Sequence, residues 1–220
     1  MTRRTFTDRA DAGRVLAGEV VRGLAATGPS GRPLVLALPR GGVPVAAEVA
    51  AAVGGDLDIA VVRKIGAPGR PEFGVGALAE DGPPVFDGGA LRALGLTEAD
   101  LADTVERERA EVGRRIRRYR GDRPPPDGAG RVVVVVDDGL ATGVTARAAL
   151  RWVRGRGPRL LLLAVPVCAR RARQALAAEA DVVVCPLAPL GFHAVGQWYA
   201  DFRQLTDDDV DRVLAAARSR

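Results

Sequence analysis

The stretch RVVVVVDDGLATGVT occupies residues 131–145 and decides the fold. Five consecutive valines, residues 132–136, form the β-branched apolar run of a strand that is buried on both faces of a parallel sheet. Asp137 and Asp138 end this run, a turn of small residues follows, and the apolar spacing then predicts a helix over residues 146–153. This order places two carboxyl groups at the carboxyl end of a strand, where open α/β sheets bind their ligands.

The composition of the turn indicates what it binds. Gly139 and Gly143 permit a positive φ and a close backbone approach, and the first N–H groups of the next helix lack partners within it. These N–H groups favour a phosphate, to which Thr142 and Thr145 add hydroxyl groups. The two acidic residues would repel a phosphate, so they are matched to sugar hydroxyls or a magnesium shell. The turn is therefore interpreted as a ribose 5-phosphate site, with a generic strand-to-helix turn as the alternative.

The sequence of hydrophobic strand, acidic pair, small-residue turn with Thr-Gly and helix resembles the signature of the type I phosphoribosyltransferase family. The resemblance implies an α/β fold with a mainly parallel twisted sheet flanked by helices, a small hood and a helical insertion. It also implies an Mg²⁺-dependent transferase that moves the 5-phosphoribosyl group of phosphoribosyl pyrophosphate (PRPP) to a nitrogenous base and releases pyrophosphate. The residues expected to hold the 5-phosphate are Gly139, Leu140, Ala141, Thr142, Gly143, Val144 and Thr145.

The same resemblance assigns roles to charged residues. Asp137, Asp138 and Lys64 are the expected catalytic residues, and the two acids would bind ribose hydroxyls and Mg²⁺, directly or through water. In purine-using members of the family, an acidic residue stands three places after the acidic pair, whereas this chain has Ala141 there. The purine assignment is therefore doubtful, an orotate-like pattern is compatible, and the acceptor stays open.

A second strand–turn–helix unit precedes the first along the chain. Residues 34–38 read as a buried strand, the turn PRGG covers residues 39–42, and residues 45–53 read as a helix. Residues 57–62 are predicted to form a third strand, and residues 65–73 (IGAPGRPEF) an exposed loop that could act as a mobile lid before a returning strand at residues 73–79. The same resemblance implies that Arg40, Gly41, Gly42, Arg63 and Lys64 bind pyrophosphate, with an ordinary tight turn and solvated charges as the alternative.

The chain is interpreted as a single domain over residues 1–220, with a core at about 30–80 and 130–185. A first helix is predicted to run from Thr7 or Asp8 to about residue 26. Residues 88–120 form a helical insertion, with one helix running to about residue 119. Its basic end could be an RNA or dimer surface, but a solvated face is favoured because a charge run alone is weak evidence. The arginines of that end are Arg114, Arg115, Arg117, Arg118 and Arg120.

The C-terminal part continues the alternation of strands and helices and then changes character. Strands are predicted at residues 160–165 and 182–185, with a helix at about 169–178 between them. Residues 186–220 form a hood and tail that end in a short helix capped at Thr206. Trp198, Tyr199 and Phe202 could stack a planar acceptor base or could anchor the C-terminus. His193 could shuttle a proton, although a structural loop histidine is the preferred interpretation.

Composition and charge restrict the partners. The 220 residues carry a net charge of +5 and an isoelectric point of about 10.1, which is compatible with nucleic acid. Abundant Arg, Ala, Gly and Pro, as a GC-rich coding sequence would give, are the stronger explanation of the charge, and a polyphosphate substrate also favours positive potential. Nucleic acid is therefore not the expected partner. The start of the chain lacks the apolar core of a signal peptide, and its longest apolar run is too short to span a bilayer. We expect a cytoplasmic protein without membrane contact, and a homodimer is compatible with the pattern. The alternative function is a regulator that senses PRPP or a nucleotide without turnover and binds RNA or DNA.

Overall fold

The computed structural model describes residues 5–25 and 31–218. Its centre is a parallel sheet of five strands in the order β2-β1-β6-β7-β8. The strands are β1 (Leu34–Ala37), β2 (Asp56–Ile59), β6 (Val132–Val136), β7 (Leu160–Ala164) and β8 (Val182–Val184). Ala37 pairs with Val136, and Val136 with Ala164, so the three central strands end at the same level. The two strand–turn units predicted to bind ligand are therefore neighbours at one edge of the sheet.

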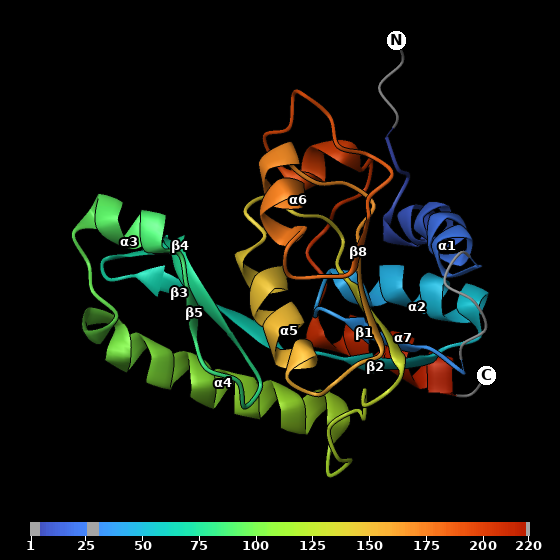
Figure 1. Cartoon of the computed structure of the whole chain (residues 1–220), viewed down its shortest axis with the longest axis horizontal. Helices are drawn as coiled ribbons and strands as arrows, with labels where there is room; N and C mark the ends of the chain where they lie inside the picture. The colour runs from blue at the N-terminus through green and yellow to red at the C-terminus, as the bar shows by residue number, and fades with distance from the viewer. Residues whose placement is uncertain (1–4, 26–30, 219–220) are drawn as a thin grey trace.

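The valine strand β6 is the middle strand of the sheet, and both of its faces are covered by helices. Val132, Val134 and Val136 pack in one hydrophobic cluster with α1 (Arg9–Ala25), α2 (Gly42–Val53) and α7 (Asp207–Arg218). Val133 and Val135 pack in the other cluster with α5 (Val144–Arg154) and α6 (Arg170–Leu176). Figure 1 shows α1 and α2 on one side of the sheet and α5 and α6 on the other. A strand enclosed in this way needs apolar side chains at every position, as the five valines provide.

A second, antiparallel sheet projects from this core. It consists of β3 (Val62–Ala67), β4 (Arg70–Ala79) and β5 (Val85–Phe86), and it lies with α3 (Gly88–Leu94) and α4 (Ala102–Arg120) at the far left of Figure 1. The prediction of one strand over residues 57–62 is wrong, because β2 ends at Ile59 and β3 begins at Val62. The loop predicted over residues 65–73 is also wrong, because most of it belongs to a β-hairpin.

The glycines and prolines of this hairpin led to its prediction as a loop from the sequence. Ala67 pairs with Arg70 across a two-residue turn, in which Gly69 has φ +70°. Proline followed by glycine suits a tight turn, so these residues mark where the strands join rather than a structureless loop. Gly66 lies at a shift in the pairing register, which interrupts the alternation by which a strand is usually found. The returning strand predicted at residues 73–79 is confirmed as part of β4.

The predicted helices are confirmed with small changes at their ends. The helical insertion contains α3, a 3-10 turn η1 (Ala99–Leu101) and α4, of which only α4 was predicted. α3 is capped by Asp87, whose side chain accepts hydrogen bonds from the N–H groups of Gly89 and Ala90. Thr206 and Asp209 exchange hydrogen bonds at the start of α7, as a capping box requires. α1 ends at Ala25, and its predicted end at about residue 26 lies outside the described residues.

Within residues 5–25 and 31–218, no helix combines enough length with enough apolar character to cross a bilayer.

Candidate active site

The turn after β6, residues 139–145, is called the phosphate turn below. It depends on Gly143, which has φ +77°, a conformation that other residues adopt only with strain. A Cβ at this position would also lie 2.8 Å from Leu176 Cδ1 of α6. Gly139 is equally confined, since its Cβ would lie 2.5 Å from Val195 Cγ1 in the hood. The turn thus lies between α6 and the hood, and residues with a side chain do not fit at positions 139 and 143.

The backbone N–H groups of the phosphate turn divide into two sets. Leu140 N–H donates to Val167 O, so it is occupied by the β7–α6 connection. In the described part of the chain, the N–H groups of Ala141 to Thr145 donate to no other backbone group, and Gly143 provides no side-chain cap. Ala141 and Thr142 are exposed. These free N–H groups at the N-terminus of α5 can bind an anion, whereas Leu140 is tied to the protein.

The acidic pair lies beside this turn in a largely buried position. Asp137 accepts a hydrogen bond from the N–H of Asp138 at 2.8 Å. Asp138 Oδ2 forms an ion pair with Arg9 Nε at 2.8 Å, and the two side chains are 13% and 10% exposed. Burial raises the pKa of the Asp137 carboxyl well above its usual value, and the nearby Asp138 charge adds to this. Burial also raises the pKa of Asp138, while the Arg9 guanidinium acts in the opposite direction. Asp138 therefore forms a direct ion pair with Arg9, whereas Arg9 acts on Asp137 only at longer range, against the larger effects of burial and of the Asp138 charge.

The turn after β1 lies directly against the acidic pair. A Cβ at Gly41 would be 2.0 Å from Asp138 Oδ2, and one at Gly42 would be 2.6 Å from Val136 O. These glycines are needed for contact rather than for an unusual φ, since Gly41 has φ −61°. The peptide bond between Pro39 and Arg40 is cis. Gly42 N–H donates to Leu38 O within the turn, and Arg40 forms an ion pair with Asp207 at 3.5 Å.

Arg63 and Lys64 belong to the antiparallel hairpin and not to the end of a parallel strand. Arg63 Nε donates to Glu108 Oε2 of α4 at 2.7 Å. Lys64 is exposed, and its Nζ donates to Glu72 O on β4 at 3.0 Å. Neighbouring residues in a strand point to opposite faces, so the two cations cannot face one ligand from the same side. The hairpin therefore separates two residues that the sequence placed together.

The hood combines both ends of the chain, which the sequence did not indicate. Phe6 N–H donates to Trp198 O, and Ala200 N–H donates to Phe6 O. Trp198 and Tyr199 are buried in a cluster with Phe6, and the Arg9 guanidinium lies 4.0 Å from the centre of the Phe202 ring. This packing favours the anchoring alternative for the aromatic residues over the stacking of a base. His193 lies exposed in the hood loop.

Comparison with known proteins identifies the fold. The family model of the phosphoribosyl transferase domain matches residues 8–199. The chain belongs to the phosphoribosyl transferase family. It resembles the crystal structure of TT1426 from Thermus thermophilus, with a TM-score of 0.78 and 45% identity over 96% of this chain and 98% of that chain. The AQ2163 protein from Aquifex aeolicus shares the fold alone, with a TM-score of 0.50 and 11% identity over 82% of this chain and 74% of that one.

Curated relatives agree with this family. Two Mycobacterium tuberculosis proteins (strains CDC 1551 / Oshkosh and H37Rv), each provisionally named a phosphoribosyl transferase, are 44% identical over 214 residues. The match covers 96% of this chain and 47% of each relative, so the chain spans about half the length of those proteins. The predicted type I phosphoribosyltransferase fold is confirmed, and its site residues stay predictions.

The basic end of α4 is largely neutralised by acidic side chains. Arg118 Nη2 contacts Asp211 at 3.0 Å, and Arg114 Nε contacts Glu111 at 2.7 Å. Glu111 has its pKa lowered to about 2, first by the hydrogen bond from Arg114 and against the effect of burial. Arg120 is buried and forms a 2.7 Å ion pair with Glu80, so it is a structural residue inside the protein. This pairing favours the structural interpretation of the charge run over a nucleic-acid surface.

The donor groups near the phosphate turn can assist a metal ion but do not enclose one. Among the described residues, no cluster of three or more His, Cys, Asp or Glu side chains could hold a metal. Mg²⁺ commonly takes one or two carboxylates and completes its octahedron with substrate phosphates and water. Asp137 and Asp138 fit that pattern, in which the substrate supplies most of the ligands.

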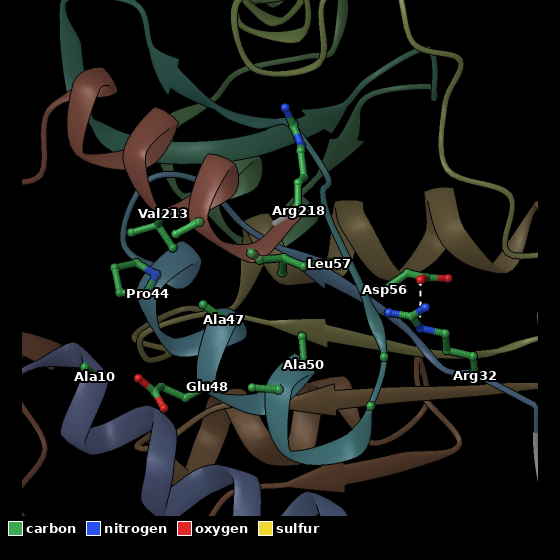
Figure 2. Close-up of a pocket in the computed structure, with 15 residues that line it drawn as sticks. Ala10, Arg32, Pro44, Ala47, Glu48, Ala50, Asp56, Leu57, Val213 and Arg218 are labelled. Atoms are coloured by element: carbon green, nitrogen blue, oxygen red, sulfur yellow. Dashed lines mark ion pairs between the residues drawn. The ribbon is translucent and has the colours of Figure 1, made fainter. Parts of the chain in front are cut away.

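A separate groove of about 730 Å³ lies between α2, α7 and the start of β2. Figure 2 shows small side chains such as Ala47 and Ala50 on its wall, and the ion pair between Arg32 and Asp56 at one end. None of the predicted site residues lines this groove. It is therefore distinct from the candidate active site.

Proposed function

We propose that this chain transfers the 5-phosphoribosyl group of PRPP to a nitrogenous base and releases pyrophosphate, in a reaction that depends on Mg²⁺. The observation that carries the proposal is the set of free N–H groups at Ala141 to Thr145 next to the buried acidic pair. Free N–H groups suit a phosphate, and carboxyl groups suit the hydroxyls of a sugar. A ribose 5-phosphate presents both kinds of group at a fixed separation.

The proposed roles follow from the chemistry of each group. The phosphate turn holds the 5-phosphate, and Asp137 and Asp138 bind the ribose hydroxyls and would also hold the ion. When bound, Mg²⁺ would neutralise charge on the pyrophosphate that leaves. Arg40, Gly41 and Lys64 would stabilise the same leaving group, with Gly42 and Arg63 as further candidates. The ion pair of Arg40 with Asp207 and the hydrogen bond of Lys64 to Glu72 O would have to open or be shared when pyrophosphate binds. The chain then acts mainly by positioning and by stabilising charge.

The acceptor stays the open part of the proposal. Ala141 supplies no carboxylate for a purine ring nitrogen. Trp198 and Tyr199 are buried within the hood, and Phe202 has Arg9 against its ring. A base would therefore have to be recognised by other groups. A cytoplasmic location and a homodimer stay predictions.

The decisive experiment supplies PRPP, Mg²⁺ and a panel of purines, pyrimidines and other nitrogen heterocycles, and measures the release of pyrophosphate. We expect release with at least one acceptor, and its loss in the D137N/D138N double variant. PRPP binding without turnover across the panel would instead support the sensing regulator. Failure to bind PRPP at all would contradict the transferase and a regulator that senses PRPP, and would leave only a regulator that senses a nucleotide.

A further inference from the structure

Arg9 reaches the acidic pair from a helix that lies outside every motif of the sequence. Its Nε donates to Asp138 Oδ2 at 2.8 Å, across 129 positions of the chain. Its Nη1 donates to Arg203 O at 2.9 Å, and its Cζ lies over the Phe202 ring, 4.0 Å from the ring centre. With 10% of its side chain exposed, Arg9 has little freedom to move. Three different partners therefore fix one guanidinium group.

The Asp138 residue is also held on its other sides. Gly41 lies so close to Asp138 Oδ2 that no side chain fits between them. The Tyr199 hydroxyl donates to the carbonyl oxygen of Asp138 at 2.5 Å. In contrast, no hydrogen bond reaches Asp138 Oδ1 from any residue that the structure describes. One carboxylate oxygen is thus held by the protein and the other is left for a ligand.

We infer that Arg9 is a positioning residue, which holds Asp138 Oδ2 so that Oδ1 can accept a hydrogen bond from a hydroxyl group of a bound sugar phosphate. This inference rests on the proposed function and extends it to a residue of α1. A carboxylate accepts hydrogen bonds from hydroxyls and repels a phosphate. Arg9 should therefore affect recognition of the sugar and not of the phosphate.

The choice of arginine has a physical reason. A guanidinium group offers five N–H donors in a planar fork and stacks on aromatic rings, so it can meet the carboxylate, a carbonyl oxygen and Phe202 together. The ammonium group of lysine can supply the charge but not the planar stacking. An R9K variant should therefore recover part of the function, and an R9M variant none of it.

The test measures binding, so that it does not depend on knowing the acceptor. Calorimetry would give the affinities of ribose 5-phosphate, 2-deoxyribose 5-phosphate and inorganic phosphate for the wild type, R9M and R9K. We expect R9M to lower the affinity for ribose 5-phosphate by about ten- to a hundredfold, the size of effect seen when a residue that orients a metal-binding group is lost. Inorganic phosphate should change by less than about twofold, because the phosphate turn is untouched. The loss with 2-deoxyribose 5-phosphate should be smaller, because one hydroxyl is missing.

R14M is the matched control. Arg14 lies on the same helix, is 59% exposed, and contacts Asp11 and Glu48 rather than the acidic pair. We expect wild-type affinities from it. Y199F offers a second variant if R9M does not fold, since it removes only one hydroxyl group. It should lower the affinity for ribose 5-phosphate more than the affinity for inorganic phosphate.

The outcomes separate the inference from the proposed function. Equal loss of both ligands in R9M and Y199F, or no loss of either, would overturn the positioning role. In another outcome, the wild type binds ribose 5-phosphate but never releases pyrophosphate from PRPP, and R9M loses affinity for ribose 5-phosphate alone. That result would overturn the transferase and support the role of Arg9. A wild type that binds no ribose 5-phosphate would overturn both.

Discussion

Two strand-to-helix turns lie side by side at the carboxyl end of the sheet, and each contains two glycines used for different purposes. In the phosphate turn, Gly143 takes φ +77°, and the N–H groups around it have no backbone partner among the residues that the structure describes. In the turn after β1, Gly41 takes an ordinary φ of −61° and is required because Asp138 occupies the place of a side chain. Gly143 gives its turn an unusual backbone conformation, and Gly41 allows two loops to touch.

The difference shows that a glycine-rich turn does not by itself identify an anion site. The two turns look alike in sequence, yet Gly42 N–H donates to Leu38 O within its own turn. Within residues 5–25 and 31–218, the N–H groups of Ala141 to Thr145 donate to no backbone group outside their own turn and helix. What distinguishes them is which groups remain without a partner after folding. Substitutions at each turn should therefore fail in different ways.

The largest effect is expected at the contact between the two turns. In G41A the new Cβ would have to displace the Asp138 carboxylate, which it would otherwise meet at 2.0 Å. A displacement of about 1 Å in a reacting site can cost about a hundredfold in rate. Pyrophosphate release under saturating PRPP would measure this. G191A is the control, because a Cβ there meets nothing within 4 Å. Near-normal activity of G41A would contradict the idea that Gly41 is needed for the contact between the two turns.

G143A should act on stability as well as on ligand binding. Its φ of +77° strains any residue with a Cβ, and that Cβ also meets Leu176 Cδ1 at 2.8 Å. We expect a loss of about 2 to 4 kcal/mol in the free energy of unfolding, from strain and overpacking together. Urea denaturation would measure it. L176A alone removes a fully buried side chain and is destabilising, so the two substitutions are compared in a double-mutant cycle. L176A should relieve the steric contact and not the strain, so G143A should still destabilise the L176A background. No cost of G143A in that background would contradict the importance of φ.

The buried Asp137 carboxyl leads to a pH-dependent prediction. Burial raises the pKa of Asp137 above its ordinary value of 3.8, so the folded state binds more protons than the unfolded state over the interval between the two values. The associated stability is complete below 3.8 and is lost as pH rises through the folded pKa. D137N should flatten this decline in urea unfolding midpoints measured from pH 4 to pH 8. A decline of unchanged slope in the variant would place its origin elsewhere.

The smallest effect is expected at the partner of the β1 turn. Asp207 has its pKa lowered, mainly by the Tyr119 hydroxyl, so its contribution to stability is present above pH 3.8 and lost as pH falls through the lowered value. D207N should cost at most about 1 kcal/mol at pH 7, because the Arg40 pair is partly exposed. It should cost less near pH 3. Pyrophosphate affinity that rises in D207N would show that Asp207 competes for Arg40.

Prediction from the sequence succeeded where the determinants are close together in the chain. The valine strand, the acidic pair, the turn and helix α5 lie within 25 residues, and local periodicity and glycine content describe them well. It failed at the hairpin of β3 and β4, because Gly66, Pro68 and Gly69 interrupt the alternation that identifies a strand. It also missed Arg9, because a basic residue in the first turn of a helix carries no signal of a partner 129 positions away.

The sequence by itself determined the central strand, the acidic pair beside a small-residue turn, and hence the family to which the chain belongs. The tertiary structure alone decided that Asp138 is paired with Arg9, that Leu140 is tied to Val167, and that Trp198 and Tyr199 are buried. The physical reason is one of range. Backbone conformation and apolar periodicity are set by neighbouring residues, whereas the partner of a charge or a buried ring is set by packing between segments that are distant in the chain.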